Sequence, residues 1–331
     1  MTLTMITRAI TFLAMAAAAS AQLSGPTMGY LPEDGTLRVI SGIPAAGSVG
    51  DAFTPDPAFN RIEVSPDQTR ALAIAKDSNA LILFTIPTGS RIPVEGAGLA
   101  PQRIIFSPSG TAAVLWFSAV QRIQVISGLS GTPSVRNVEA SFAGGEPAGL
   151  AVSDDGQWVA GAWASGVYSF GPDGRVGLLP VTGAATAVCF FHGRNDVAVT
   201  TPRQVILVRD IAGAVTPNVI WNKPDDPPPA DPATVPPAQV AVGLATSFDN
   251  SHLSIAGNLG ALATFDLIAG TSIGADCGCL PTGLFPMGGS LFRLTGATDG
   301  AMKIFDASTN DVSFVPLAAT AATPVTEGGQ Q

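Results

Sequence analysis

Apolar runs of five or six residues recur along the chain, and each follows a short polar turn. The clearest runs cover residues 71–75, 112–117 and 158–163. A sheet with one face in water alternates apolar and polar residues, but these runs do not alternate. We therefore predict short antiparallel sheets that are covered on both faces, as happens when each sheet is stacked between two copies of itself.

The turn that precedes these runs has a repeated chemistry. It reads Ser-Pro-Asp at Ser65, Ser-Pro-Ser at Ser107 and Ser-Asp-Asp-Gly at Ser153, with weaker copies around residues 191, 247 and 287. Serine that bonds the backbone, proline with a fixed φ and glycine at the fourth position favour a type I turn. A second signature, Asp or Ser shortly before Gly, ends the third strand of each unit, as in residues 266–270 and 210–213.

These openings at Ser65, Ser107 and Ser153, with the Asp/Ser-to-Gly endings, resemble the YVTN/WD40-like β-propeller repeats of exported proteins. The resemblance covers about residues 28 to 317, although the chain lacks the Trp-Asp ending of WD40 blades. It implies an all-β fold, a β-propeller with blades of four antiparallel strands. It is specific for architecture and implies no particular function.

The number of blades follows from the repeat. Six units begin with an inner strand near residues 62, 104, 150, 188, 244 and 284. Residues 28–53 match the outer strands of one more blade, because residues 38–42 align with residues 124–128. We predict about seven blades, with six as the alternative. Residues 314–317 would supply the inner strand that this partial blade lacks and so close the ring as a clasp.

The two ends of the chain are expected to lie outside the fold. Residues 1–21 have the pattern of a signal peptide: Arg8, an apolar run over 9–19, and the small residues Ala19-Ser20-Ala21. We expect a mature chain from Gln22 that is secreted or periplasmic, with no membrane span after cleavage. Residues 22–318 then form a single propeller domain, and residues 319–331 form a disordered tail.

The composition argues against one class of partner. The net charge is −9 and the chain contains no basic run. Nucleic-acid binding needs a positive face, so no nucleic-acid partner is expected. Residues 222–238 are rich in proline and acidic residues, which predicts a stiff loop between two blades. The loop is either a solvated connector or a docking segment for a protein or envelope partner.

Three cysteines limit the redox and metal chemistry. Export favours a disulfide between Cys277 and Cys279, either as a local staple or as a redox-active bridge, and leaves Cys189 as a buried thiol. Zinc sites need three or four ligands, and neither histidine is near this pair in sequence. The sequence therefore predicts no metal site and no cofactor.

The catalytic residue types are sparse. His192 and His252 fall on turns at the rim away from the start of the inner strands, which gives no support to a shared catalytic site. Residues 270–274 spell Gly-x-Ser-x-Gly, but this pattern follows a third strand of the repeat rather than opening a helix. We predict no catalytic residues.

The candidate ligand site is the end of the central channel where the inner strands begin, called the mouth below. Arg61 and Arg103 share one register there, and Glu146 lies in a nearby connector. Two arginines either hold an anionic group or only solvate the mouth. The other inner strands have small residues at this register, which we expect to leave the mouth open: Gly149, Ala187, Gly243 and Gly283.

Two functions from different classes fit these residues. The sequence favours an exported, non-catalytic binding or scaffold propeller with an unknown ligand or partner. The alternative is a propeller-fold enzyme of the lactonase, lyase or quinone-dependent dehydrogenase type. That alternative needs titratable groups that converge at the mouth, and the sequence offers only Arg61, Arg103 and Glu146.

Overall fold

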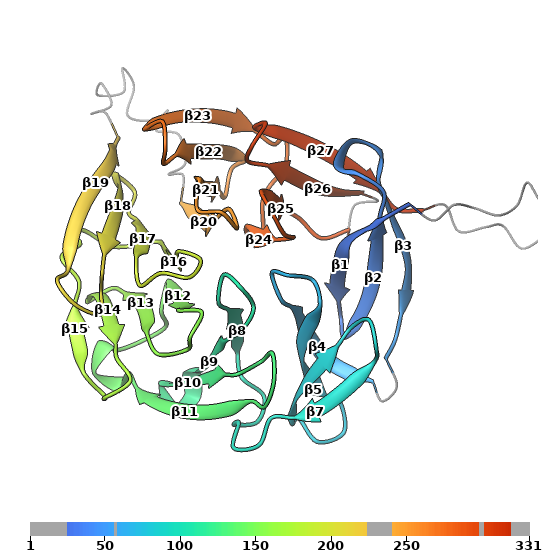
Figure 1. The fold of residues 1–331 in the computed structure, drawn as a ribbon, viewed down its shortest axis with the longest axis horizontal. Helices are drawn as coiled ribbons and strands as arrows, with labels where there is room; N and C mark the ends of the chain where they lie inside the picture. The colour runs from blue at the N-terminus through green and yellow to red at the C-terminus, as the bar shows by residue number, and fades with distance from the viewer. Residues whose placement is uncertain (1–24, 56–57, 224–239, 298–300, 319–331) are drawn as a thin grey trace, which may run out of the picture.

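The protein is a ring of seven antiparallel sheets around a central axis (Figure 1). The structure, a computed structural model, describes residues 25–55, 58–223, 240–297 and 301–318. The predicted all-β fold and the seven-blade propeller are confirmed, and six blades are excluded. The predicted signal peptide (1–21), nearly all of the proline-rich loop (222–238) and the tail (319–331) lie outside the described residues.

The first blade has three strands in the described residues, and every other blade has four. The strands of the first three blades are β1 (Thr27–Glu33), β2 (Thr36–Ser41), β3 (Ser48–Phe53); β4 (Phe59–Val64), β5 (Arg70–Ala75), β6 (Leu81–Thr85), β7 (Ser90–Pro93); β8 (Arg103–Phe106), β9 (Ala113–Phe117), β10 (Arg122–Ser127) and β11 (Ser134–Glu139). Three single-turn 3-10 helices join strands, at Pro44–Ala46, Ser118–Val120 and Ser141–Ala143.

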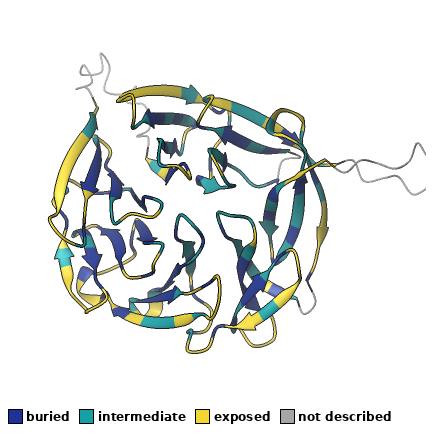
Figure 2. Ribbon diagram, viewed as in Figure 1, coloured by how far each residue is buried: buried dark blue, intermediate teal, exposed yellow. Residues whose placement is uncertain are grey.

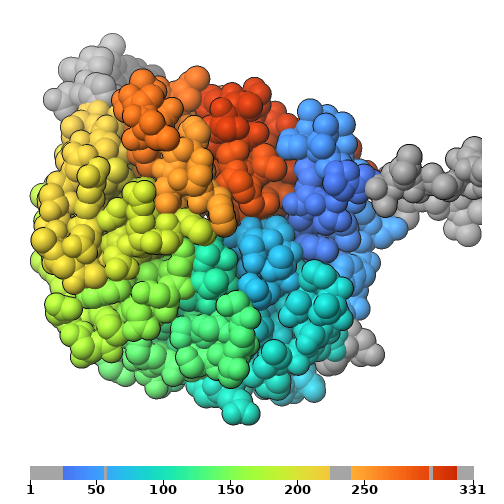
Figure 3. Space-filling model, viewed as in Figure 1, coloured from blue at the N-terminus to red at the C-terminus, as the bar shows by residue number. Residues whose placement is uncertain are grey.

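The remaining four blades follow in chain order around the ring, so that the last blade meets the first (Figure 3). Their strands are β12 (Gly149–Val152), β13 (Val159–Trp163), β14 (Gly166–Phe170), β15 (Val176–Leu178); β16 (Ala187–Phe190), β17 (Val197–Thr200), β18 (Gln204–Arg209), β19 (Thr216–Asn222); β20 (Ala241–Thr246), β21 (His252–Gly257), β22 (Ala261–Asp266), β23 (Thr271–Asp276); β24 (Phe285–Pro286), β25 (Leu291–Arg293), β26 (Ala301–Asp306) and β27 (Asp311–Pro316).

The core consists of layers between neighbouring blades rather than of one central cluster. The second strands β5, β9, β13 and β17 are buried almost throughout, whereas the outermost strands are mostly exposed (Figure 2). Trp116 of the third blade packs edge-on against Trp163 of the fourth, with 6.2 Å between ring centroids. The apolar runs therefore have both faces covered by neighbouring sheets, as predicted.

The repeated serine organises the turn between the first and second strands. Ser153 Oγ donates to the carboxylate of Asp155, 2.5 Å away, and accepts the backbone N–H of Trp158 at 2.9 Å. The buried Ser247 makes the same pair of bonds with Asp249 and His252. Hydrogen bonds from Ser247 and Ser251 lower the pKa of Asp249 to about 2. The turn is thus fixed by contacts within six residues, which is why the sequence reveals it.

The first blade lacks an inner strand in the described residues. The β1–β2 hairpin, with Asp34 and Gly35 at its tip, lies beside the start of β4, so β1 has the register of a second strand. Tyr30 and Pro32 of β1 consequently line the central cavity directly. The prediction that residues 28–53 supply only the outer strands of this blade is confirmed.

The predicted source of the inner strand was wrong. Residues 314–316 belong to β27, the outermost strand of the last blade, where Phe314 pairs with Lys303. Leu317 then forms one parallel bridge with Val49 of β3, and the N–H of Ala318 donates to the Val49 carbonyl. The ring is therefore tied at its outer edge, because β26 already holds residues 311–316 in an antiparallel ladder that keeps them far from the axis.

The turns between first and second strands form one face of the ring, here called the turn face, and hydrogen bonds link them from blade to blade. Gln68 accepts the N–H of Tyr30 at 2.8 Å and donates to the Pro286 carbonyl at 3.1 Å, so it joins the first, second and last blades. Asp154 accepts from Ser109 and Gly193 in the two blades beside its own, at 2.7 and 2.6 Å.

Gln68 and Asn250 hold the backbone position at which two other turns place glycine. Both have φ of +59°, as against +74° at Gly110 and +67° at Gly156. A residue other than glycine adopts a positive φ only at a cost in free energy. Asn250 bonds both the N–H and the carbonyl of His192 in the adjacent blade, at 2.8 and 2.9 Å. Contacts between blades therefore compensate for the strained backbone at these two turns.

Substitution of Gln68 by alanine tests this role. Gln68→Ala keeps the positive φ but removes both hydrogen bonds to other blades, leaving the Tyr30 N–H without its acceptor. We expect the free energy of unfolding to fall by about 1–3 kcal/mol. Denaturant unfolding followed by tryptophan fluorescence measures this difference.

Asn79→Ala is the matched control, because Asn79 also has a positive φ, of +56°, but its side chain makes an exposed hydrogen bond with Asn60 within the same blade. We expect a smaller loss for the control. An equal loss in the two variants would contradict a special role for Gln68.

Candidate functional site

The central channel is a cavity of about 760 Å³. The inner strands of six blades and β1 of the first blade supply its wall, and the turns at Pro66, Pro108 and Phe248 line its end at the turn face. The mouth, at the opposite end, has the charged side chains Arg61, Glu63, Arg103 and Arg293. This end of the channel is the candidate site.

Arg61, on β4, is held by contacts on two sides. Its Nε and Nη2 donate to one carboxylate oxygen of Glu63 at 2.9 and 2.7 Å, and its Nη1 donates to the Gln102 carbonyl at 2.7 Å. Residues two apart on a strand point to the same face, which places Glu63 beside Arg61. The charge of Arg61 is thus largely balanced within the site.

Arg103, at the start of β8, is balanced less well. Its Nη1 donates to the Pro147 carbonyl at 2.7 Å, and among the described residues no carboxylate lies within 4.0 Å of its guanidinium. Burial lowers the pKa of Arg103, Glu146 opposes this shift and the charge of Arg61 adds to it. Arg103 therefore presents a partly buried positive charge to the cavity.

Glu146 lies near the mouth but is not part of the cavity wall. Its Oε2 accepts the indole N–H of Trp116 at 2.6 Å, and the residue is otherwise exposed. The structure thus brings Arg61 and Arg103 to one cavity and places Glu146 beside it. Glu146 acts on the cavity through its charge rather than through direct contact.

Arg293 is a third arginine at the mouth, and the sequence analysis missed it. It ends β25, a second strand, and its guanidinium stacks over the ring of Phe285 at 4.1 Å from the centroid. Burial lowers the pKa of Arg293 to about 10, while the charges of Glu63 and Glu33 oppose the shift. One signal in the sequence relates Arg293 to the mouth. Arg293 pairs with Phe285 across the ladder, and Phe285 directly follows Leu284, the residue with which the repeat unit opens.

Two of the small residues at the mouth have a packing role that was not predicted from the sequence. A Cβ at Gly243 would lie 2.5 Å from the Cβ of Leu284 and would overlap that residue's backbone nitrogen. A Cβ at Gly149 would lie 3.0 Å from the backbone nitrogen of Val188. These two glycines let neighbouring inner strands approach closely, and both line the channel.

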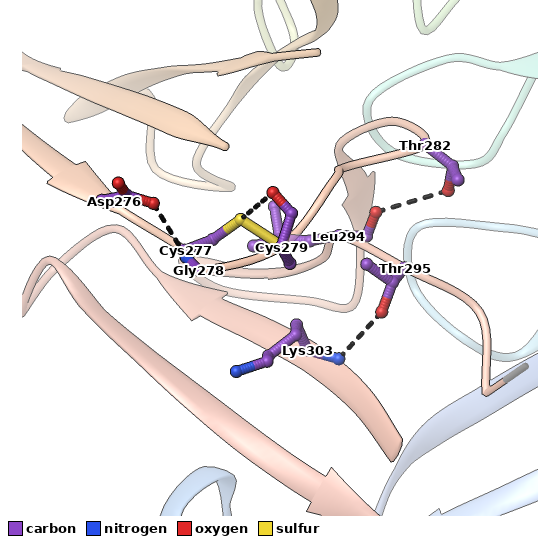
Figure 4. Close-up of a disulfide and its surroundings, with 8 residues drawn as sticks. All are labelled: Asp276, Cys277, Gly278, Cys279, Thr282, Leu294, Thr295 and Lys303. Carbon is purple, nitrogen blue, oxygen red and sulfur yellow. Dashed lines mark hydrogen bonds between the residues drawn. A yellow bond between two sulfur atoms is a disulfide. The ribbon is translucent and has the colours of Figure 1, made fainter. Parts of the chain in front are cut away.

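The cysteines lie in two different environments. Cys277 and Cys279 form a disulfide with an S–S distance of 2.07 Å in the connector after β23 (Figure 4). The N–H of Cys277 donates to the Gly260 carbonyl, which ties the loop to a neighbouring hairpin. Cys189 is a free thiol on β16 that is half-buried and lines the channel, rather than fully buried as predicted; burial raises its pKa to about 12.

The remaining sequence candidates lie away from the mouth. The ring of His192 stacks on Phe248 at 4.1 Å, and Nδ1 of His252 bonds Ser251 at 2.7 Å, both on the turn face. Ser272 of the Gly-x-Ser-x-Gly pattern pairs with Phe265 inside the sheet, so it does not lie on a strand-to-helix turn.

The described residues carry neither a metal-binding cluster nor a helix that spans a membrane. Within the described ranges, His, Cys, Asp and Glu do not gather in groups of three or more that would suit a metal ion. In the same part of the chain, no helix has the length and apolar character needed to cross a bilayer.

Solved structures with the same fold are similar to this chain at low sequence identity. Apo AztD from Citrobacter koseri aligns over 88% of this chain and 95% of its own, with a TM-score of 0.52 and 12% identity. Virginiamycin B lyase from Staphylococcus aureus aligns over 79% and 85%, with a TM-score of 0.53 and 13% identity. A functionally unknown protein from Desulfotomaculum acetoxidans aligns over 88% and 100%, with a TM-score of 0.53 and 12% identity.

These likenesses support the propeller fold and nothing finer. No family model matches the sequence, and no curated protein matches it.

Substitution of Gly243 tests the packing at the mouth. Gly243→Ala places a methyl group against the backbone of Leu284, so we expect the free energy of unfolding to fall by about 2 kcal/mol or more. The matched control is Gly274→Ala on the outer strand β23, where the nearest atom to the new Cβ is 3.7 Å away. Denaturant unfolding compares the two variants, and equal stabilities would contradict close packing at Gly243.

Proposed function

We propose that this protein is an exported, non-catalytic binding propeller whose channel mouth receives the anionic group of a ligand. The fold supplies a rigid ring with one cavity along its axis. Three arginines line that cavity at the mouth, whereas Glu63 is the only carboxylate among the described residues of its wall. A site with this excess of positive charge favours an anion.

The partly buried charge of Arg103, which has no carboxylate partner among the described residues, is the observation that carries the proposal. Burying a charge without a carboxylate partner is costly, and such a charge is retained where something else balances it. Guanidinium groups bind carboxylate and phosphate through paired N–H donors, and within the described part of the chain Arg103 uses only Nη1 on the protein. The rest of its donor set is available to a ligand in the cavity.

Binding is favoured over turnover because the described residues of the mouth offer no free general acid or base. The carboxylate of Glu63 is already paired with Arg61, and both histidines lie on the turn face. General acid–base catalysis needs a titratable group within reach of the reacting atoms. The propeller-fold enzyme remains the alternative, and turnover of a lactone or a related substrate would establish it.

Citrate tests the anion site. We expect citrate to bind the purified mature chain at low ionic strength, where charge attraction is screened least. Arg103→Gln removes the unpaired charge, and we expect its affinity for citrate to fall at least about fivefold, as for the loss of a charge-assisted hydrogen bond. Isothermal titration calorimetry measures both constants.

Arg209→Gln is the matched control, because Arg209 is exposed at the end of β18 that lies toward the turn face. We expect citrate affinity to be unchanged in this variant. Failure of the wild-type chain to bind citrate, or equal affinities for the wild type and Arg103→Gln, would contradict the proposed site.

Processing of the N-terminus tests export. When the full chain is expressed in a bacterium, we expect the exported product to begin at Gln22, because the small residues 19–21 form the cleavage pattern. Ala19→Leu together with Ala21→Leu removes that pattern, and we expect the precursor to accumulate uncleaved. Intact-mass measurement of cytoplasmic and envelope fractions distinguishes the two, and an unprocessed cytoplasmic wild-type chain would contradict export.

A further inference from the structure

Among the residues that the structure describes, the first blade has no inner strand, and a side cleft lies next to the mouth. The cleft has a volume of about 380 Å³ and lies between the β1–β2 hairpin (residues 32–35), the start of β4 (residues 60–63) and the pair Phe285 and Arg293. Known ligand pockets span about 300–1,000 Å³, so this cleft suits a small molecule. It shares Arg61, Glu63 and Arg293 with the channel wall, which makes the two spaces continuous.

The cleft differs from the mouth in its charges. Three carboxylates line it, those of Glu33, Asp34 and Glu63, against the two guanidinium groups of Arg61 and Arg293. A ligand that carried only negative charge would meet repulsion on this side. Charges of both signs within a small cleft instead match a ligand that has both signs itself.

The carboxylates are not all used by the protein. Glu33 pairs with Arg38 at 2.8 Å through Oε2 and accepts the N–H of Ala297 through Oε1. Glu63 uses only Oε1 for Arg61, and its Oε2 has no hydrogen-bond donor among the described residues. Glu63 therefore has one oxygen to offer to a cationic group in the cleft.

Arg293 supplies the opposite charge at the base of the cleft. It is half-buried, its one hydrogen bond among the described residues is a long one to the Thr295 carbonyl at 3.4 Å, and no described carboxylate lies within 4.0 Å of it. The ring of Phe285 covers one face of its guanidinium and leaves the edges, where the N–H groups point, for an acceptor. Such a cation is an anchor for a carboxylate.

We propose that the cleft and the mouth together bind an α-amino acid, with its carboxylate on Arg293 and its ammonium group on Glu63. This inference rests on the proposed function, which it deepens by naming the ligand class. The side chain of the amino acid would extend into the channel, past Phe285. The room lies beside β1, where the described residues place no inner strand.

The test starts from the twenty common L-amino acids, which are screened by thermal shift against the mature chain at low ionic strength. The best binder is then compared by calorimetry with its analogue that lacks the amine and with its analogue that lacks the carboxylate. We expect both analogues to bind at least about tenfold more weakly, because each loses a charge-assisted hydrogen bond.

Two variants assign the residues. We expect Arg293→Gln to lower the affinity for the amino acid and for its deaminated analogue alike. We expect Glu63→Gln to lower the affinity for the amino acid at least about fivefold but to leave the affinity for the deaminated analogue unchanged. A merely structural effect would not produce this difference. Glu139→Gln, at an exposed carboxylate on the outer strand β11, is the control and should bind as the wild type does.

The outcomes separate this inference from the proposed function. If citrate binds through Arg103 but no amino acid binds, the inference is overturned and the anion site stands. If the deaminated analogue binds as well as the amino acid, the ligand is a plain anion and the role of Glu63 is overturned. If neither citrate nor any amino acid binds, both proposals fail. The comparison of analogues uses the wild-type chain, so it holds even if Arg293→Gln does not fold.

Discussion

The structure depends on the packing of one sheet face against the next. Each blade is apolar on both sides, so it is stable only between two others, and a closed ring provides two neighbours for every blade. The room for side chains between neighbouring blades is smallest near the axis, because the inner strands converge there. Gly149 and Gly243 fit this space by having no side chain where the next strand's backbone passes. The same glycines thereby fix the shape of the mouth.

Features that depend on nearby residues could be predicted from the sequence. The turn at Ser153 is held by bonds to Asp155 and Trp158, so six residues are enough to recognise it, and its repetition identifies six of the seven blades. Features that depend on distant pairing could not be predicted. Residues 314–317 have strand character in either position, and only their ladder with β26 places them at the outer edge. Arg293 reaches the mouth from a second strand, whereas the alignment of the repeats compared only residues at the start of the first strands.

The three-stranded first blade connects the fold with the candidate site. The side chain of Gln68 lies near the turn face, in the half of the gap where an inner strand of the first blade would run. It forms hydrogen bonds with β1 and with the last blade. The half nearest the mouth has no such side chain and becomes the side cleft. Pro32 lies on this exposed edge of β1 and has no N–H to offer, which disfavours pairing with a further strand. The cleft is therefore suited to a small ligand rather than to an added strand.

Charge is scarce in this protein, so its placement at the mouth is informative. Only 12% of the residues are charged, yet three arginines and three carboxylates line the mouth and the side cleft. The protein pairs Arg61 with Glu63 and Arg38 with Glu33, which leaves Arg103 and Arg293 without carboxylate partners among the described residues. If the arginines served only to hydrate the mouth, their partial burial without a counter-charge would cost stability and no interaction would offset that cost. A ligand that supplies the missing negative charge removes that cost, and the side cleft gives such a ligand room beside Arg293.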